Sequence, residues 1–336
     1  MMVRRRLLVG AALLVLGPAA GMGTAWGQQG AESEVVTVPA LDTRSAQDHT
    51  AIAPSTPRPN TATTQDAAGG AGIVELGVAE LLRSGRTATD WRLARLRGNP
   101  QILVLEFPNL AEQGAAMNRV AAFVEKAEAP RDRVLNDDEL LQLIVSHGDN
   151  PQTFYQGHNY LVSQLARFFT MAWEQRQTPN AQEEQLLRLL LERRVLAQEG
   201  ASYTARGLQA IVTFTAPQSD DATTPQDETI DARRRESVLV HELSHGVFFT
   251  NASYRDHCWR FWRERMSADE RARFRRVLAR MNYDPSNEGL LVNEMQALLM
   301  HTPDTRAFGA PSLGVSQTQL INLRARFRKG MPAVST

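Results

Sequence analysis

Cysteine is nearly absent from this chain, which has one, Cys258, among 336 residues. An intramolecular disulfide is therefore excluded, and the fold must be held by a hydrophobic core, which a domain of about 260 residues can supply. We expect Cys258 to be a small buried apolar residue. An excess of charge of either sign is also lacking, since 37 basic residues face 37 acidic ones. Net charge thus gives no indication of a nucleic acid or an anionic membrane as a partner.

A long uninterrupted hydrophobic run is missing as well. The segment MMVRRRLLVGAALLVLGPAAGMGTAWGQQ has three arginines and then an apolar stretch that glycines and Pro18 interrupt. This stretch is short for a membrane span, and a small-x-small pattern follows it at Ala25–Gly27. We therefore expect residues 1–27 to be a cleavable secretory signal, with an uncleaved N-terminal anchor as the alternative. The mature protein would then be periplasmic or secreted, with no stable membrane span.

Aromatic residues are absent from residues 28–72, which are rich in Ala, Thr, Pro, Ser and Gln. Such a segment cannot bury enough apolar surface to offset the entropy of ordering, so we expect a disordered linker. Patterned sequence begins near Ile73. We expect one domain over residues 73–336, with an N-terminal part of helices and strands (73–200) and a second part that carries the functional site (201–336).

Most of this domain has the pattern of helices. N-caps and capping boxes mark their starts at Asn136, Asn180, Ser267 with Glu270, and Ser316 with Gln319. The helix that begins at Asn180 is expected to end at Gly200. Two apolar runs, Gln101–Pro108 and Gly207–Pro217, predict buried strands, and the polar stretch Ser219–Thr229 predicts a loop that could be a lid or a processing site. The fold class predicted is α+β, mainly helical, with a few strands.

Histidine is scarce, yet two of the 7 histidines stand four residues apart in VLVHELSHGVFF, Val238–Phe249. On a helix from about Ala232, His241 and His245 project from one face and can hold one Zn²⁺. Glu242 is rotated by about 100° and can reach a water on the metal, which is the geometry of a general base. The uncharged flanks indicate a buried helix. The alternative is a pair of ordinary core histidines.

A catalytic zinc site also needs a third protein ligand and an open position. The close-spaced third histidine of metzincins is missing after His245, and we assign Asp256 and His257 to a solvated helix surface. Glu294 lies in the middle of a predicted helix, Glu288–His301, with apolar neighbours one turn away on either side. It would therefore be buried, and a metal would offset the cost of burying its carboxylate. A salt bridge to an arginine, or a position in an exposed groove, is the alternative.

The motif HELSH followed by NEMQA, Asn293–Ala297, resembles the gluzincin branch of zinc metallopeptidases. The matching residues cover under a tenth of the chain. The longer runs HELSHGVFFTNASYR and NEMQALLMHTPD also resemble secreted bacterial proteins. The resemblance to gluzincins implies a zincin-like domain in which His241, His245 and Glu294 hold zinc, Glu242 is the base, and the substrate is a peptide or protein.

Two further features are implied by the same resemblance. Gluzincins place a substrate-binding edge strand just before the active-site helix, and Gly207–Pro217 is in the right place to be that strand. They also use a tyrosine or histidine to stabilise the developing oxyanion, for which His301, Tyr283 and Tyr254 are candidates. No motif in this sequence selects among the three.

Three functions are compatible with these patterns. The first is a zinc-dependent peptidase. The second is a zinc hydrolase that acts on an amide of cell-wall material, with the same metal chemistry. The third is a non-catalytic secreted interaction protein with a structural or vestigial metal site, which predicts a fourth protein ligand such as His257 or His301.

Overall fold

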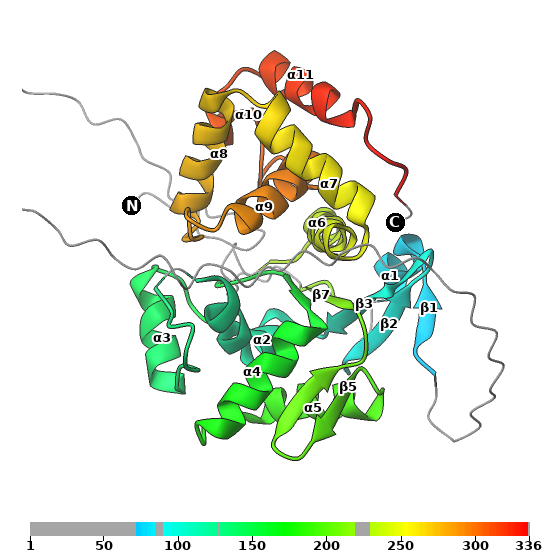
Figure 1. The fold of residues 1–336 in the computed structure, drawn as a ribbon, viewed down its shortest axis with the longest axis vertical. Coiled ribbons are helices and arrows are strands. Elements are labelled where there is room, and N and C mark those ends of the chain that lie inside the picture. The colour runs from blue at the N-terminus through cyan, green and yellow to red at the C-terminus, as the bar shows by residue number, and fades with distance from the viewer. Residues whose placement is uncertain (1–71, 85–89, 127, 219–228, 335–336) are drawn as a thin grey trace, which may run out of the picture. The chain divides into compact units, whose positions relative to one another are not determined.

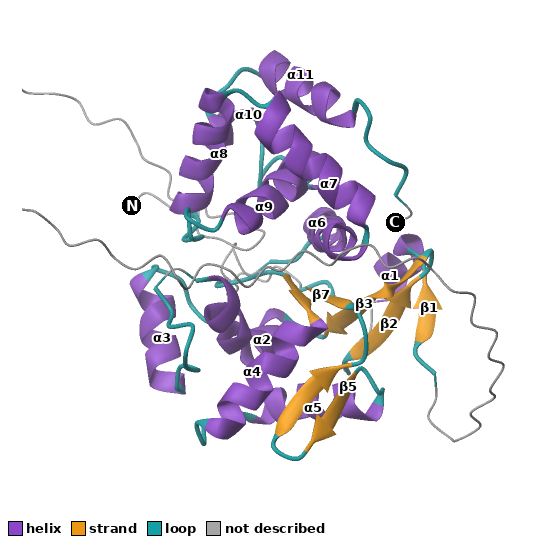
Figure 2. Ribbon diagram, viewed as in Figure 1, coloured by secondary structure: helices purple, strands orange, loops and turns teal. Residues whose placement is uncertain are grey.

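The computed structural model describes residues 72–84, 90–126, 128–218 and 229–334. The expected secretory signal, nearly all of the expected linker, and the loop at 219–228 lie outside this part of the chain. The described residues belong to one compact unit. It is an α+β fold in which helices predominate over a mixed five-stranded sheet and a small two-stranded sheet (Figures 1 and 2).

The helices and strands follow one another without long irregular stretches in the described part. The strands are β1 Val74–Leu76, β2 Arg92–Leu96, β3 Asn99–Phe107, β4 His158–Leu161, β5 Leu196–Glu199, β6 Ser202–Ala205 and β7 Ala210–Thr215. The helices are α1 Val78–Ser84, α2 Leu110–Glu125, α3 Asp137–Ser146, α4 Val162–Glu174, α5 Ala181–Glu192, α6 Ala232–Thr250, α7 Ala252–Arg260, the π-helix η1 Phe261–Arg265, α8 Ala268–Arg280, α9 Glu288–His301, α10 Ala310–Leu313 and α11 Gln317–Arg328.

Local capping signals set most helix starts as expected. The four predicted N-caps all accept a backbone hydrogen bond from the third helical residue, and all four have capping boxes. The expected end of α5 at Gly200 is wrong, because the helix stops at Glu192. Arg194 takes a positive φ of 54° and turns the chain into β5, which pairs with β6. Leucine has a high intrinsic preference for helix, but here the strand pairing of Leu196 in the hairpin is the stronger effect.

The five-stranded sheet has the order β1-β2-β3-β7-β4. β7 pairs in parallel with β3 and antiparallel with β4, so both of its edges are occupied. The expectation that Gly207–Pro217 supplies an edge strand is therefore wrong, and β4 stands at the edge instead. Its four residues, His158–Leu161, are too few for an alternating pattern to appear in the sequence.

Helices cover both faces of this sheet. Alternate residues of β7 point to opposite sides, as expected for a strand: Val212 and Phe214 join a core with α6 to α11, whereas Ile211 joins a core with α2, α4 and α5. Figure 1 shows α6 lying between the sheet and the helices α7 to α11. Cys258 is buried in the first of these cores, as predicted.

α6 packs unusually close to the sheet. A Cβ atom at Gly246 would lie 3.0 Å from the side chain of Ile102 on β3, so the glycine allows the helix to approach the strand. At the other end of the helix, the buried Arg235 guanidinium forms an ion pair with Glu106 on β3 at 2.6 Å and donates to the carbonyl of Thr215 at 2.9 Å. These contacts fix α6 on the sheet on both sides of the His241–His245 pair.

Candidate metal centre

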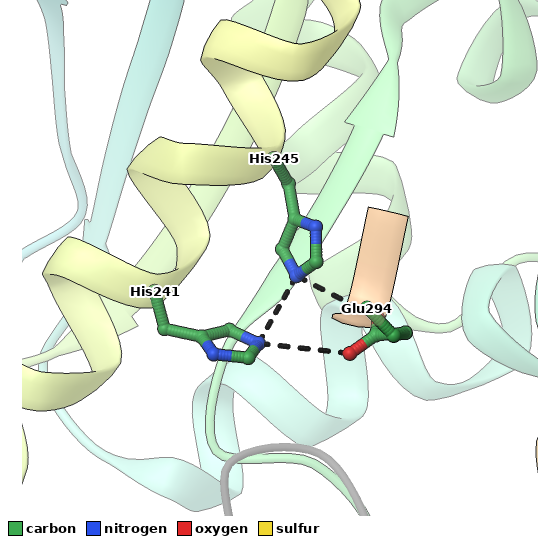
Figure 3. A group of neighbouring side chains, drawn as sticks. All are labelled: His241, His245 and Glu294. Carbon is green, nitrogen blue, oxygen red and sulfur yellow. Dashed lines mark hydrogen bonds and ion pairs between the residues drawn. The ribbon is translucent and has the colours of Figure 1, made fainter. Parts of the chain in front are cut away.

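The structure brings together the three residues that the sequence suggests as metal ligands. His241 and His245 project from α6, and Glu294 reaches them from α9 (Figure 3). The two Nε2 atoms are 3.0 Å apart. The Glu294 carboxylate oxygens lie 3.8 Å from Nε2 of His241 and 3.6 Å from Nε2 of His245. This buried group could bind a metal ion, because two ligands of a tetrahedral zinc lie roughly 3.3–3.4 Å apart.

Packing of α9 on α6 places the carboxylate. α9 spans Glu288–His301, as predicted, and buries Leu291 and Leu298 in the same core as Leu243 of α6. Glu294 lies between those leucines on the buried face and is 3 % exposed. No arginine among the described residues forms an ion pair with Glu294, whose carboxylate lies beside the two histidines instead, so the arginine salt bridge considered as the alternative is not found.

Thr302 determines which ring nitrogen of His241 has a lone pair available to bind a metal. Its hydroxyl donates to the carbonyl of Ala297 at 3.0 Å, so the same oxygen must accept from Nδ1 of His241 at 2.8 Å. Nδ1 therefore carries the proton and Nε2 presents a lone pair. A hydrogen bond of this kind orients a metal-binding imidazole and raises its basicity. Sequence reasoning did not identify Thr302, whose only signal is its place just after the end of α9.

Replacement of Thr302 by valine tests this orienting role. Thr302→Val keeps the shape but removes the acceptor, so we expect the affinity for Zn²⁺ to fall by about 10- to 100-fold. Competition with a chromogenic chelator would measure the change. Thr305→Val is the matched control, because Thr305 is exposed and lies in the same loop. Equal zinc affinity in the two variants would contradict the role of Thr302.

Both imidazoles are in the neutral state that metal binding requires. Burial lowers the pKa of His241 well below its usual value, with smaller contributions from His245 and His301. Burial also lowers the pKa of His245 to about 4. The two Nε2 atoms are 3.0 Å apart, and a proton on Nε2 of His245 would bridge them as a hydrogen bond in the absence of a metal. With that proton on Nδ1 instead, both Nε2 lone pairs face one point, where a cation could bind.

Burial makes the charged form of Glu294 costly as well. Burial raises the pKa of Glu294 well above its usual value, and the nearby acids Glu125 and Glu242 raise it further. A hydrogen bond with Tyr283 acts in the opposite direction but is the smaller effect. A bound divalent ion would offset the desolvation of this carboxylate directly.

The second nitrogen of His245 is less well satisfied than that of His241. Its Nδ1 is buried and has no hydrogen-bond partner of good geometry among the described residues. The side chain of Asn293 is close enough to raise the pKa of His245 against the larger effect of burial, although it is not aligned for a full hydrogen bond. Asn293 is thus the candidate acceptor for this nitrogen, from the residue just before Glu294.

The three candidates for oxyanion stabilisation occupy two different places. The Tyr254 hydroxyl donates to Oε1 of Gln296 at 2.8 Å and lies 2.9 Å from Nε2 of His301. Tyr283 instead hydrogen bonds with Glu294. Tyr283 therefore contacts a candidate ligand directly, whereas Tyr254 contacts His301 and Gln296, and none of the three belongs to the candidate ligand group itself.

The expected surface position of His257 is wrong, whereas its neighbour Asp256 is exposed as predicted. His257 is 2 % exposed, and its Nε2 lies 2.8 Å from the carbonyl of Phe327. α11 packs over this part of α7, and the rings of His257 and Phe327 meet edge to face at 4.9 Å. The contact is between residues far apart in sequence, so the local pattern around His257 does not reveal it.

Comparisons with family models, curated proteins and solved structures find no match to this chain. The interpretation of the site therefore depends on its own geometry and on the HELSH and NEMQA motifs. In the part of the chain that the structure describes, no helix is both long enough and apolar enough to cross a bilayer.

Proposed function

We propose that the protein is a secreted or periplasmic zinc-dependent peptidase with a zincin-like domain. His241, His245 and Glu294 would hold the metal, and Glu242 would be the general base. The observation that carries the proposal is the convergence of two neutral imidazoles and one carboxylate in a buried group, with Glu242 next to the first histidine on the same helix. Two histidines and a glutamate are a ligand set of catalytic zinc sites.

The number of ligands supports a catalytic site over a structural one. Structural zinc sites have four protein ligands, whereas catalytic sites have three and leave one position for water or substrate. The group found among the described residues has three members, and neither His257 nor His301 is one of them. The fourth ligand expected of a non-catalytic protein is therefore not found in that part of the chain.

Each group has a separate task in the proposed reaction. A bound Zn²⁺ would act as a Lewis acid that polarises a carbonyl and makes water a better nucleophile at neutral pH. Glu242 takes the proton of the attacking water and passes it to the leaving amide nitrogen. Thr302 orients the imidazole of His241 through its Nδ1, and Asn293 is the candidate for the same task at His245.

Zinc-dependent cleavage of peptides tests this function. We expect the purified protein to cleave members of a peptide library. A chelator should abolish this cleavage, and added Zn²⁺ should restore it. Mass spectrometry of the products would show the cleaved bonds. A parallel digest of peptidoglycan is the control for substrate class. If the protein cleaves peptidoglycan but no peptide, its function is that of a cell-wall amide hydrolase and not of a peptidase.

A further inference from the structure

The carboxyl group of Glu242 is contacted by a segment far from it in sequence. Nδ2 of Asn159 donates to Oε2 of Glu242 at 2.9 Å, across a sequence separation of 83 residues. Asn159 lies on the edge strand β4, where its partner in the register is Val212. Directly opposed residues of two strands point to the same face of a sheet. Because Val212 packs in the core with α6, the side chain of Asn159 also points toward α6.

The other oxygen of the same carboxyl lies close to Gly157. A Cβ atom at Gly157 would lie 2.6 Å from Oε1 of Glu242, 2.7 Å from its Cγ and 2.9 Å from its Cδ. Real Cβ atoms do not approach other heavy atoms this closely, so the glycine is needed for Glu242 to keep its present position. Gly157 and Asn159 thus contact the two oxygens of one carboxyl from a single short segment.

We propose that Gly157 and Asn159 position the general base, a role that rests on the proposed function of Glu242. A glutamate side chain has several staggered rotamers, and a carboxyl that changes rotamer would leave the reacting water. The Asn159 amide holds Oε2, and the backbone at Gly157 limits movement of Oε1. A misplacement of about 1 Å at a reacting group can lower a rate by about 10²-fold, which is enough to make such positioning valuable.

The structure offers a matched control for Asn159. Nδ2 of Asn99, on β3, donates to Oγ1 of Thr250 at 2.9 Å, which is another amide bond from the sheet to α6. Thr250 is the last residue of the helix and is two turns away from Glu242. Asn99→Leu and Asn159→Leu therefore remove the same kind of contact, with similar burial and length, at two places on one helix.

Kinetics of the zinc-loaded variants would test the proposal. We expect Asn159→Leu to lower kcat by about 10- to 100-fold, with KM changed less than about twofold and zinc content unchanged. Asn99→Leu should stay within about twofold of the wild type in both constants. If Asn159→Leu does not fold, Gly157→Ala displaces the same carboxyl from its other side. Gly289→Ala is the control for that variant, because its nearest atom would be 3.5 Å away.

A binding measurement provides a readout that does not depend on turnover. Acetohydroxamate chelates zinc through its two oxygens and binds more tightly where an acceptor beside the metal takes its proton or hydrogen bond, which Glu242 would do. We expect calorimetry to show at least about tenfold weaker binding of acetohydroxamate to zinc-loaded Asn159→Leu than to Asn99→Leu.

The possible outcomes separate this inference from the proposed function. Equal kcat and equal acetohydroxamate affinity in the two leucine variants would overturn the positioning role while leaving the peptidase intact. The wild type could also cleave no peptide while Asn159→Leu binds acetohydroxamate more weakly than the wild type does. That result would support the positioning role and contradict the peptidase. A wild type that takes up no zinc would overturn both.

Discussion

Glu242→Gln is expected to lower kcat/KM for peptide cleavage by about 10²- to 10⁴-fold, the usual contribution of a general base. Glutamine has the same shape as glutamate but cannot take a proton from water at neutral pH. Its amide oxygen can still accept from Nδ2 of Asn159, so the side chain should keep its place. Zinc content should not change, because Glu242 is not a member of the ligand group.

Initial rates on a cleaved peptide, together with metal analysis of the same samples, would check this result. Glu236→Gln is the control, since Glu236 lies on the same helix but is exposed. We expect it to retain wild-type activity. Full activity in Glu242→Gln would remove Glu242 from the mechanism, even if the metal site itself is correct. Loss of zinc from Glu242→Gln would mean that the residue binds the metal.

Loss of a ligand is the second change expected to have a large effect. Zinc binding contributes about 10–16 kcal/mol in structural sites with four ligands, which is roughly 2.5–4 kcal/mol for each ligand. His245→Ala and Glu294→Ala should therefore weaken zinc binding by roughly 10²- to 10³-fold. Mass spectrometry should find one zinc per wild-type chain and little or none in either variant after dialysis.

His257→Ala is the matched control, because His257 is also a buried histidine but contacts Phe327 instead of the ligand group. Thermal unfolding gives a second readout, since a metal that binds only the folded protein raises Tm. A chelator should lower the Tm of the wild type and of His257→Ala, but not that of His245→Ala. Zinc retained in Glu294→Ala and lost from His245→Ala would place the third ligand elsewhere. No zinc in the wild type after reconstitution would contradict the metal site.

Two parts of the site were predictable from the sequence because they depend on local geometry. A spacing of four residues places His241 and His245 on one face of a helix, and the helix itself begins near Ala232 as expected. Apolar residues at one-turn spacing around Glu294 likewise predict its burial, and α9 has the predicted bounds. Helical period and capping act over a few residues, so one segment of sequence is enough to reveal them.

Tertiary structure alone decided which other residues contact His241, Glu242 and the rest of the candidate site. The short strand β4 adds to β7, makes β7 internal, and carries Asn159 to Glu242. Thr302 reaches His241 across 61 residues of sequence. These contacts depend on how separate elements pack and pair, and a four-residue strand or a single threonine after a helix has no periodic pattern of its own. The sequence by itself therefore predicted the candidate metal ligands and the proposed base, whereas the packing of α6 against α9 and β4 decided which residues contact them, because those contacts arise only when distant segments are brought together.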